Sequence, residues 1–436
     1  RNASSVIESV TLEDLGKFSD QNIADSLQRV PGVQIQRNDD GRSGDRLSVR
    51  GLGPQYVQVT VNGRGIVSFG NTGQGGFRGF NLDQLPSEVI SGLTVFKSPV
   101  AENVEPGLGG LLDIATLRPL NYKSSSGAFF GSVDVRGEID DLANSLRPRF
   151  SGVVGVKLFD DTLGLYVSGV RSSTRTRTDQ VNVSYNQRTV PIRPASGPDV
   201  PTTFLAPSAW DFYSIDNERI RNTISGGLQW KPTPSLEINA DWTYNNYDNN
   251  QNRQRPNIQT TGLYTNGPLL ASEVTIVNGV LTGLTGTRLG VPSTLYESIA
   301  SVENYKSKSN FGGVNVKWTN DRLTVSADYG RSLVDFNGKF LLGYGEGVEN
   351  LAIGYALVNG LPTFRLPSPT PQSEFAYFLF NDGRQLKSDR NSYRLDLEYK
   401  LSSEFKLKAG VRYEESSVDS RGGGFFSCLP ASGNLC

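Results

Sequence analysis

A strict alternation of apolar and polar residues runs through most of the chain from residue 127 onward. The clearest run interleaves the apolar residues Leu236, Ile238, Ala240, Trp242 and Tyr244 with Glu237, Asn239, Asp241 and Thr243. The same period recurs over 323–329, 393–401 and 406–413. Because successive side chains of a strand point to opposite faces, this period predicts long strands with one apolar and one polar face. About nine such strands are expected, near 127–137, 149–159, 163–177, 219–231, 235–248, 303–319, 322–336, 387–401 and 405–416.

The connections between these strands are alternately short and long. Tight turns are expected at 160–162, 232–235, 320–322 and 402–404, and long polar loops at about 178–218, 248–302, 337–385 and from 416 onward. Short turns at one end and long loops at the other are typical of an outer-membrane barrel. Aromatic residues beside the tight turns would form an interfacial girdle: Phe159, Trp230, Trp318, Tyr399 and Phe405. A soluble β-sandwich also alternates, but its strands are shorter and it gives no reason for the asymmetry of the connections.

Composition excludes several classes of protein and site. The net charge is -1 over 436 residues, which leaves no basic footprint for nucleic acid. No apolar run approaches the roughly 20 residues that a membrane helix needs. Histidine is absent, which removes histidine-dependent catalysis, and no third or fourth ligand accompanies the two cysteines to hold zinc. Carboxylate pairs such as Asp39-Asp40 and Asp160-Asp161 lie in expected turns, and no Ser/His or metal constellation is present, so we expect no enzymatic activity, no metal site and no cofactor. The two cysteines, Cys428 and Cys436, lie in one Gly/Ser-rich segment and predict a local disulfide in an oxidising compartment.

The first 121 residues have a different, mixed pattern. Helical spacing over 21–30 ends at Pro31-Gly32, and a second short helix is expected over 82–90. Short strand candidates lie at 33–35, 47–49, 57–61, 93–96 and 111–115. We therefore divide the chain into an α+β domain, 1–121, and the N-terminal part of a transmembrane antiparallel β-barrel with long extracellular loops, 122–436.

The relative sizes of these two parts suggest that one encloses the other. A domain of this length is a globule roughly 35 Å wide, whereas nine tilted strands would close into a cylinder only ~18 Å across. A cylinder of about 22 strands, ~43 Å wide, would hold the globule. We therefore expect the chain to continue past Cys436, with about nine of some 22 barrel strands present here.

Three ordered segments resemble the plug domain of TonB-dependent outer-membrane receptors, most closely the subfamily of Caulobacter- and Xanthomonas-like bacteria. They are LGKFSDQNIADSLQRVPGVQIQR, LSVRGLGPQYVQVTVNGR and LPSEVISGLTVFKSPVAENVEPGLGGLLDIATLRP. The resemblance implies an α+β plug inside a barrel of 22 strands in the outer membrane of a Gram-negative bacterium. It also implies that TonB, with ExbB and ExbD, pulls on a TonB box upstream of Arg1, roughly 15–25 residues before it. Lipid, lipopolysaccharide and a surface lipoprotein are further expected partners.

The same resemblance supplies expectations for individual residues. Arg50 and Lys97 would be plug cations that pair with barrel carboxylates, which we expect to lie beyond residue 436. The chain departs from the wider family by having Thr94 where many members carry a glutamate, and by a turn that reads Lys97-Ser98-Pro99.

Candidate ligand-binding residues lie in glycine-bearing plug loops and in the barrel loops. The plug-apex candidates are Arg42, Tyr56, Arg64, Phe69, Asn71, Phe77 and Arg78, and the extracellular-loop candidates are Tyr185, Trp210, Tyr213, Tyr264 and Tyr296. We predict active import of a scarce solute, with a carbohydrate or oligosaccharide favoured because aromatic platforms suit a polar ring. A ferric siderophore is the alternative and would favour a basic pocket around Arg37, Arg42, Arg46 and Arg78. A surface adhesin or structural barrel without transport is the alternative from another class.

Overall fold

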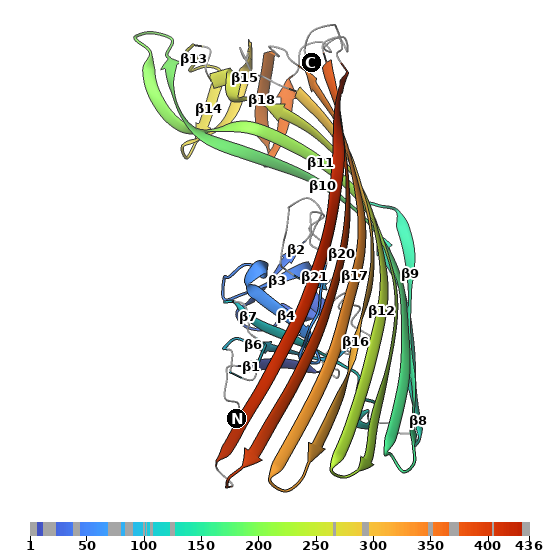
Figure 1. Ribbon diagram of the computed structural model, residues 1–436. Helices are drawn as coiled ribbons and strands as arrows, with labels where there is room; N and C mark the ends of the chain where they lie inside the picture. The colour runs from blue at the N-terminus through green and yellow to red at the C-terminus, as the bar shows by residue number, and fades with distance from the viewer. Residues whose placement is uncertain are drawn as a thin grey trace.

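The computed structural model shows a small mixed domain, the plug, lying against the concave side of a tall curved sheet, the wall (Figure 1). The structure describes residues 7–11, 23–37, 44–68, 80–82, 90–98, 101, 103–104, 108–122, 127–264, 267–289, 296–347, 352–365, 375–402 and 405–429. Within this part of the chain, no helix is long and apolar enough to cross a membrane.

The plug is built around a five-stranded sheet with the order β1-β6-β7-β4-β5. These strands are β1 (Ile7–Thr11), β6 (Ile90–Phe96), β7 (Gly110–Thr116), β4 (Val57–Val61) and β5 (Arg64–Gly65). Only β4 and β7 run parallel among the pairs of this sheet. Beside it lie the short helix α2 (Ile23–Leu27), the hairpin of β2 (Val33–Arg37) and β3 (Gly44–Val49), and the 3-10 turns η1 (Pro54–Tyr56) and η4 (Pro119–Asn121). The first predicted helix is confirmed, and most of the second, 83–89, lies outside the described residues.

The described wall contains nine long strands, each antiparallel to the next. They are β8 (Phe129–Asp140), β9 (Ser145–Leu158), β10 (Leu163–Arg193), β11 (Val200–Thr233), β12 (Leu236–Gln259), β16 (Tyr296–Thr319), β17 (Leu323–Gly347), β20 (Phe375–Lys400) and β21 (Lys406–Leu429). All nine predicted strands are therefore confirmed, with the tight turns at 160–162, 232–235 and 320–322, whereas the turn at 402–404 lies partly outside the described residues. In the described residues β8 pairs only with β9 and β21 only with β20, so the sheet is part of a barrel wall and is not closed.

The predicted long loops are mostly folded, which corrects our expectation. The strands continue far beyond the expected membrane band, and β10 with β11 bends over the plug (Figure 1). Short strands join this overhang: β13 (Leu269–Leu270), β14 (Val274–Val277), β15 (Val280–Leu289), β18 (Ala352–Val358) and β19 (Leu361–Arg365). Together with the 3-10 turn η5 (Thr261–Tyr264), they enclose a hydrophobic cluster of their own. We call this unit, residues 181–212, 258–264, 267–289 and 352–365, the cap.

The wall buries polar side chains on its inner face and exposes apolar side chains on its outer face, the opposite of a soluble protein. Along β12, Asn239, Asp241 and Thr243 are buried toward the plug, whereas Trp242 between them is 49% exposed on the outer face. Exposed apolar side chains recur on the outer faces of the other strands, as lipid contact requires. The aromatic residues predicted beside the tight turns are also exposed: Phe159, Trp230, Trp318, Tyr399 and Phe405. The alternation therefore places apolar side chains outward and polar side chains in the lumen.

Candidate functional site

The contact between plug and wall is centred on the β4–β5 turn, Asn62-Gly63. Both residues have positive φ, 53° and 75°, as a two-residue hairpin turn requires. Asp113 of β7 accepts hydrogen bonds from the Gly63 amide at 2.7 Å and from the Thr60 hydroxyl at 2.6 Å. Asn62 is bound to Thr116 by its Nδ2, 2.8 Å from the hydroxyl oxygen, and by its Oδ1, 3.0 Å from the backbone amide. These bonds fix the turn to β7, and with it the residue that follows, Arg64.

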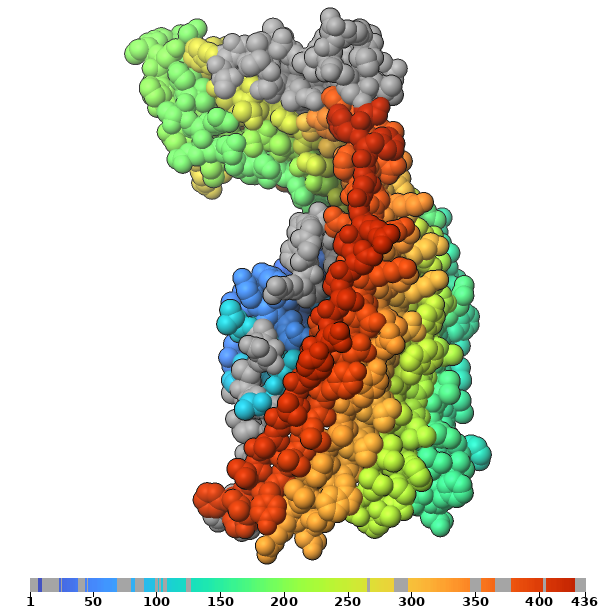
Figure 2. Space-filling model, viewed as in Figure 1, coloured from blue at the N-terminus to red at the C-terminus, as the bar shows by residue number. Residues whose placement is uncertain are grey.

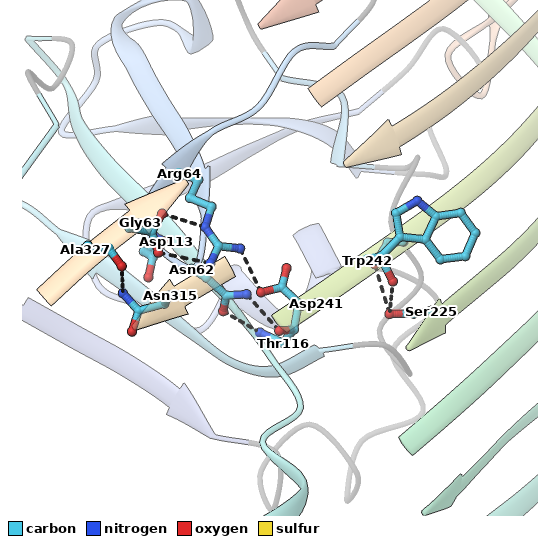
Figure 3. A network of polar contacts seen from close by, with 12 residues as sticks. Asn62, Gly63, Arg64, Asp113, Thr116, Ser225, Asp241, Trp242, Asn315 and Ala327 are labelled. Atoms are coloured by element: carbon cyan, nitrogen blue, oxygen red, sulfur yellow. Dashed lines mark hydrogen bonds and ion pairs between the residues drawn. The ribbon is translucent and has the colours of Figure 1, made fainter. Parts of the chain in front are cut away.

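Arg64 crosses from the plug to two aspartates of the wall, Asp241 and Asp328. Figure 3 shows its contact with Asp241. Its Nη1 donates to Asp241 on β12 at 2.7 Å, and its Nε and Nη2 donate to the two oxygens of Asp328 on β17 at 2.7 and 3.0 Å. Arg64 is 5% exposed, so the three charges are largely removed from solvent. We call these three residues the clamp. The guanidinium makes two hydrogen bonds to Asp328 and one to Asp241. This geometry fixes both the distance and the orientation of the plug relative to the two wall strands.

Two glycines provide the space for the Arg64 side chain. Asp241 is paired with Gly313 of β16, and Gly313 is paired with Gly330 of β17. A Cβ at Gly313 would lie 2.7 Å from Arg64 Cζ, and one at Gly330 would lie 2.7 Å from Arg64 Cδ. The wall strands therefore leave a depression without side chains where the arginine lies.

The two aspartates of the clamp affect the pKa of Arg64. Burial alone would lower the pKa of Arg64, but hydrogen bonds to Asp328 and the negative charges of Asp241 and Asp328 outweigh that effect and raise it. Burial also raises the pKa of the plug residue Asp113, although the bonds from Thr60 and Gly63 oppose the shift. Arg64 therefore stays charged in the interface.

The rest of the interface is mainly polar. Val67 N donates to the Ser332 hydroxyl at 3.1 Å, and Leu120 N donates to Gln229 Oε1 at 3.0 Å. From the wall, Val170 and Phe311 are the buried side chains that join the plug's hydrophobic cluster within the described residues. In the described residues, the plug core is thus made almost entirely of plug side chains, and hydrogen bonds, ion pairs and these two apolar side chains join it to the wall.

A cavity adjoins the clamp on the side of the tight turns. Its volume is about 700 Å³, and it lies between plug residues 101 and 103–104 and the inner faces of β17, β20 and β21. Its lining includes charges of both signs: Arg394, Asp396, Glu398, Lys408, Arg412 and Glu414. The cavity is therefore suited to a hydrated, polar solute.

The locking roles of Arg50 and Lys97 toward carboxylates beyond residue 436 stay predictions. Lys97 lies 2.5 Å from Glu8 across the β1–β6 pair, so its ion pair is internal to the plug. Arg50 is exposed at the turn after β3, with φ 55°. The bridging cation is Arg64, which we had predicted to be a ligand contact at a plug apex. Its carboxylate partners come from β12 and β17, whereas we had expected barrel carboxylates only beyond residue 436.

The carboxylates were a signal that sequence reasoning missed. Asp241 and Asp328 occupy polar positions of two alternating runs, so they point into the lumen at membrane depth. Ionisable residues at that depth are costly and usually have a partner. Their presence could have suggested a cation on the plug.

Most other plug-apex candidates cannot be compared with the structure. Arg42, Phe69, Asn71, Phe77 and Arg78 lie outside the described residues. Tyr56 is exposed in η1, at the opposite end of β4 from the clamp turn. As ligand contacts these residues stay predictions.

The loop aromatics divide between the surface and the core of the cap. Trp210 and Tyr264 are buried in the cap cluster, which makes them packing residues rather than ligand platforms. The Trp210 ring packs edge-on against Phe364 at 5.6 Å. Tyr213 lies under the guanidinium of Arg255, 5.5 Å from its ring centroid, and Tyr185 is 40% exposed. Tyr296 begins β16, and its side chain is outside the described residues.

The predicted disulfide also stays a prediction. Cys428 lies in β21, opposite Phe378 of β20. Cys436 is outside the described residues.

The plug has its own core and is held against the inner face of a wall whose outer face is apolar. These two features define the class of protein: a membrane barrel that is closed by a plug domain. Residues 1–110 match the family model described as TonB-dependent Receptor Plug Domain. The chain therefore carries the plug of a TonB-dependent receptor, and the resemblance seen in its sequence is confirmed. Its fold is that of a TonB-dependent outer-membrane transporter, with a plug and part of the barrel. The narrower subfamily stays a prediction.

Several solved structures are similar to the chain at low identity. A mutant of the ferric enterobactin receptor from Pseudomonas aeruginosa is 13% identical, with 95% of this chain and 71% of that chain covered and a TM-score of 0.42. A siderophore receptor from Acinetobacter baumannii is 10% identical, with 96% and 62% covered and a TM-score of 0.36. An outer membrane transporter from Escherichia coli is 9% identical, with 94% and 69% covered and a TM-score of 0.37. What each of these proteins binds is a property of that protein.

Proposed function

We propose that this protein imports a scarce solute across the outer membrane of a Gram-negative bacterium, by TonB-dependent displacement of its plug. The observation that carries the proposal is the clamp. In the described residues, the plug has a core that only two wall side chains join, and it is attached to the wall by the ion pairs of Arg64 and by hydrogen bonds, so it can be held in place and also released. A plug meant only to seal the barrel would be better served by a continuous apolar interface.

The topology of the plug sheet supports a pulling mechanism. TonB, driven by ExbB and ExbD, would capture a TonB box upstream of Arg1, so force would enter through β1. This strand is one edge of the plug sheet, and β5 with Arg64 is at the other edge. The pull would therefore reach the clamp last, after it has passed through β6, β7 and β4. Solute would then pass beside the plug, where the charged cavity adjoins the clamp.

For the solute, we propose a carbohydrate or oligosaccharide. The lumen above the clamp carries aromatic rings among carboxylates and amides, which suits rings that have an apolar face and a rim of hydroxyl groups. The resemblance to receptors of Caulobacter- and Xanthomonas-like bacteria points the same way.

A ferric siderophore is the second candidate. Two of the similar structures described above are a ferric enterobactin receptor and a siderophore receptor. In this chain, Arg221, Arg253 and Arg255 on the wall strands β11 and β12 would favour an anionic chelate. Binding titrations of the purified protein with a ferric catecholate, a ferric hydroxamate and a panel of glycans separate the two candidates. Tight binding of a ferric chelate with no response to any glycan would contradict the carbohydrate proposal and favour a ferric siderophore as the solute.

A reversible crosslink between plug and wall tests the transport proposal. The Val67 backbone nitrogen lies 3.1 Å from the Ser332 hydroxyl oxygen, so the two positions are neighbours and Val67→Cys with Ser332→Cys is the pair to crosslink. We expect the oxidised pair to abolish energised uptake with ligand binding preserved, and a reductant to restore uptake. Each single cysteine variant is the control.

A non-transporting adhesin or structural barrel makes the opposite prediction. Uptake that is unchanged by the oxidised crosslink, or by loss of TonB, would favour that class. Attachment to surfaces or to other cells that persists without TonB would add to it.

A further inference from the structure

The lumen face of the wall carries a rising series of aromatic rings between the clamp and the cap. On β17, Asp328 and Ser332 contact the plug, so every second residue from there faces the lumen. Phe336, Phe340 and Tyr344 continue that face at intervals of four residues. We call the strip formed by Tyr305, Phe336, Phe340, Phe380, Tyr344 and Phe378 the aromatic strip.

The rings of the strip are close to one another across neighbouring strands. The Tyr305 and Phe336 ring centroids are 5.8 Å apart, those of Phe340 and Phe380 are 6.2 Å apart, and those of Tyr344 and Phe378 are 5.5 Å apart. From Phe336 to Tyr344 the strip extends about 26 Å along β17, at about 3.3 Å per residue. The strip is therefore elongated, unlike a compact pocket.

Carboxylates flank the strip in register. Glu303 of β16 and Asp382 of β20 lie directly opposite Phe340, one on each side. Higher on the wall, Glu297 accepts hydrogen bonds from the Tyr344 hydroxyl at 2.9 Å and from Gln259 Nε2 at 2.8 Å. A ring between two carboxylates offers an apolar face and two strong acceptors, whereas the same carboxylates repel an anionic chelate.

The lower end of the strip touches the plug segment that carries the clamp. Phe336 belongs to a small cluster with Tyr247 and Val334, and Val67 packs against that cluster. Val67 follows Arg64 by three residues and is hydrogen-bonded to Ser332. Phe336 is 2% exposed, so it is the packed base of the strip and the rings open to a solute begin above it, at Phe340. A solute on Phe340 is thus close to the plug segment that leads to Arg64. Figure 2 shows a recess on the concave side between the cap and the plug.

We infer that the aromatic strip is a binding track for a linear chain of sugar rings, which stack on the aromatic faces and donate hydroxyl hydrogen bonds to Glu303, Asp382 and Glu297. This inference rests on the proposed import function and narrows its substrate to extended oligosaccharides. Several aligned platforms bind a chain of rings more strongly than one ring, because each added ring finds another platform at little extra entropic cost.

The test measures binding of linear glucans and xylans of graded length, from monosaccharide to hexasaccharide, by calorimetry on the full chain in detergent. We expect affinity for one of the two series to rise with length. Phe340→Ala and Phe378→Ala should each lower hexasaccharide affinity about tenfold, as loss of a central aromatic contact typically does. Phe340→Tyr, which keeps the ring, should retain affinity. Leu341→Ala is the matched control, since Leu341 is the next residue of β17 and is exposed on the outer face, and it should stay within twofold of the unmodified chain.

The outcomes separate the track from the transport function. Glycan affinity that does not depend on length, or that falls equally in Phe340→Ala and Leu341→Ala, overturns the track and leaves TonB-dependent import standing. Binding of a ferric chelate without any glycan overturns both the track and the sugar proposal. The expected length dependence together with uptake that does not need TonB supports the track and overturns only the import mechanism.

Discussion

Arg64 of the plug and Asp328 of the wall form a two-point ion pair, with the guanidinium Nε and Nη2 2.7 and 3.0 Å from the two carboxylate oxygens. The pair joins residues 264 positions apart in the chain, one in the plug and one in the wall. Asp241 adds a second carboxylate on the same guanidinium. Within the clamp, one arginine side chain makes the directed bonds to both carboxylates.

Loss of the Arg64 side chain should release the plug. Arg64→Ala leaves Asp241 and Asp328 as uncompensated buried charges, a change that typically costs about 3–5 kcal/mol. We expect a lower unfolding temperature and passage of large antibiotics through the outer membrane, measured as increased sensitivity of cells to vancomycin. Arg331→Ala is the matched control, because its ion pair with Asp389 is exposed and such pairs contribute at most about 1 kcal/mol. Equal effects of the two variants would contradict the proposal that the clamp holds the plug in place.

A methyl group in the depression under Arg64 should have the same consequence. In Gly313→Ala the new Cβ would approach the Tyr329 carbonyl oxygen and, at 2.7 Å, Arg64 Cζ. We expect Arg64 to be forced out of the clamp and the leak to appear without any change of charge. Gly343→Ala is the control, since its Cβ would have 3.8 Å to the nearest atom, the carbonyl oxygen of Ala300. A tight barrel in Gly313→Ala would show that the glycine pair is not needed.

The cap should contain a tyrosine whose hydroxyl loses its proton only at unusually high pH. Burial in the cap raises the pKa of Tyr264 from its ordinary value of 10.0 to about 12, although hydrogen bonds to Tyr355 and Thr260 oppose the shift. Below pH 10 both folded and unfolded states keep the proton, so this group has no effect on stability. Between pH 10 and 12 the unfolded state ionises first, and the free energy of unfolding falls by up to about 2.7 kcal/mol.

Absorbance at 295 nm checks that assignment. In a pH titration of the folded protein, Tyr264→Phe should remove amplitude only from the part of the curve above about pH 11. At neutral pH the variant also lacks the hydroxyl contact with Tyr355 at 3.1 Å, so a stability loss of about 1 kcal/mol is expected. Amplitude that disappears near pH 10 instead would place Tyr264 outside the cap core.

Charge substitutions should distinguish the two faces of the wall. Leu395 is exposed on the outer face of β20, and Leu395→Arg would place a charge in lipid at a cost of about 2–4 kcal/mol. Ser326 faces the lumen cavity and is paired with Asp396, so Ser326→Arg gains both space and a counter-charge there. Urea unfolding of the refolded proteins in lipid vesicles measures both. Equal costs would reject the assigned faces.

Alternation along single strands was enough to predict the nine wall strands, their tight turns and the outward direction of Trp242, because the side-chain period of a strand is a local property. The plug was recognisable for a similar reason: its motifs lie within three short segments of residues 15–119, most of which the plug family model also matches. Local pattern did not reveal that the presumed loops fold into a cap, where Trp210 and Tyr264 are buried. That outcome depends on contacts between segments more than a hundred residues apart, such as Trp210 with Phe364.

The clamp was decided only by the tertiary structure. The sequence determined that Arg64 follows a turn and that Asp241 and Asp328 point into the lumen. Which cation meets which carboxylate follows from the register of β12, β16 and β17 and from the height at which the plug rests against them. Register and height are cooperative results of the whole sheet, so no short stretch of sequence contains them.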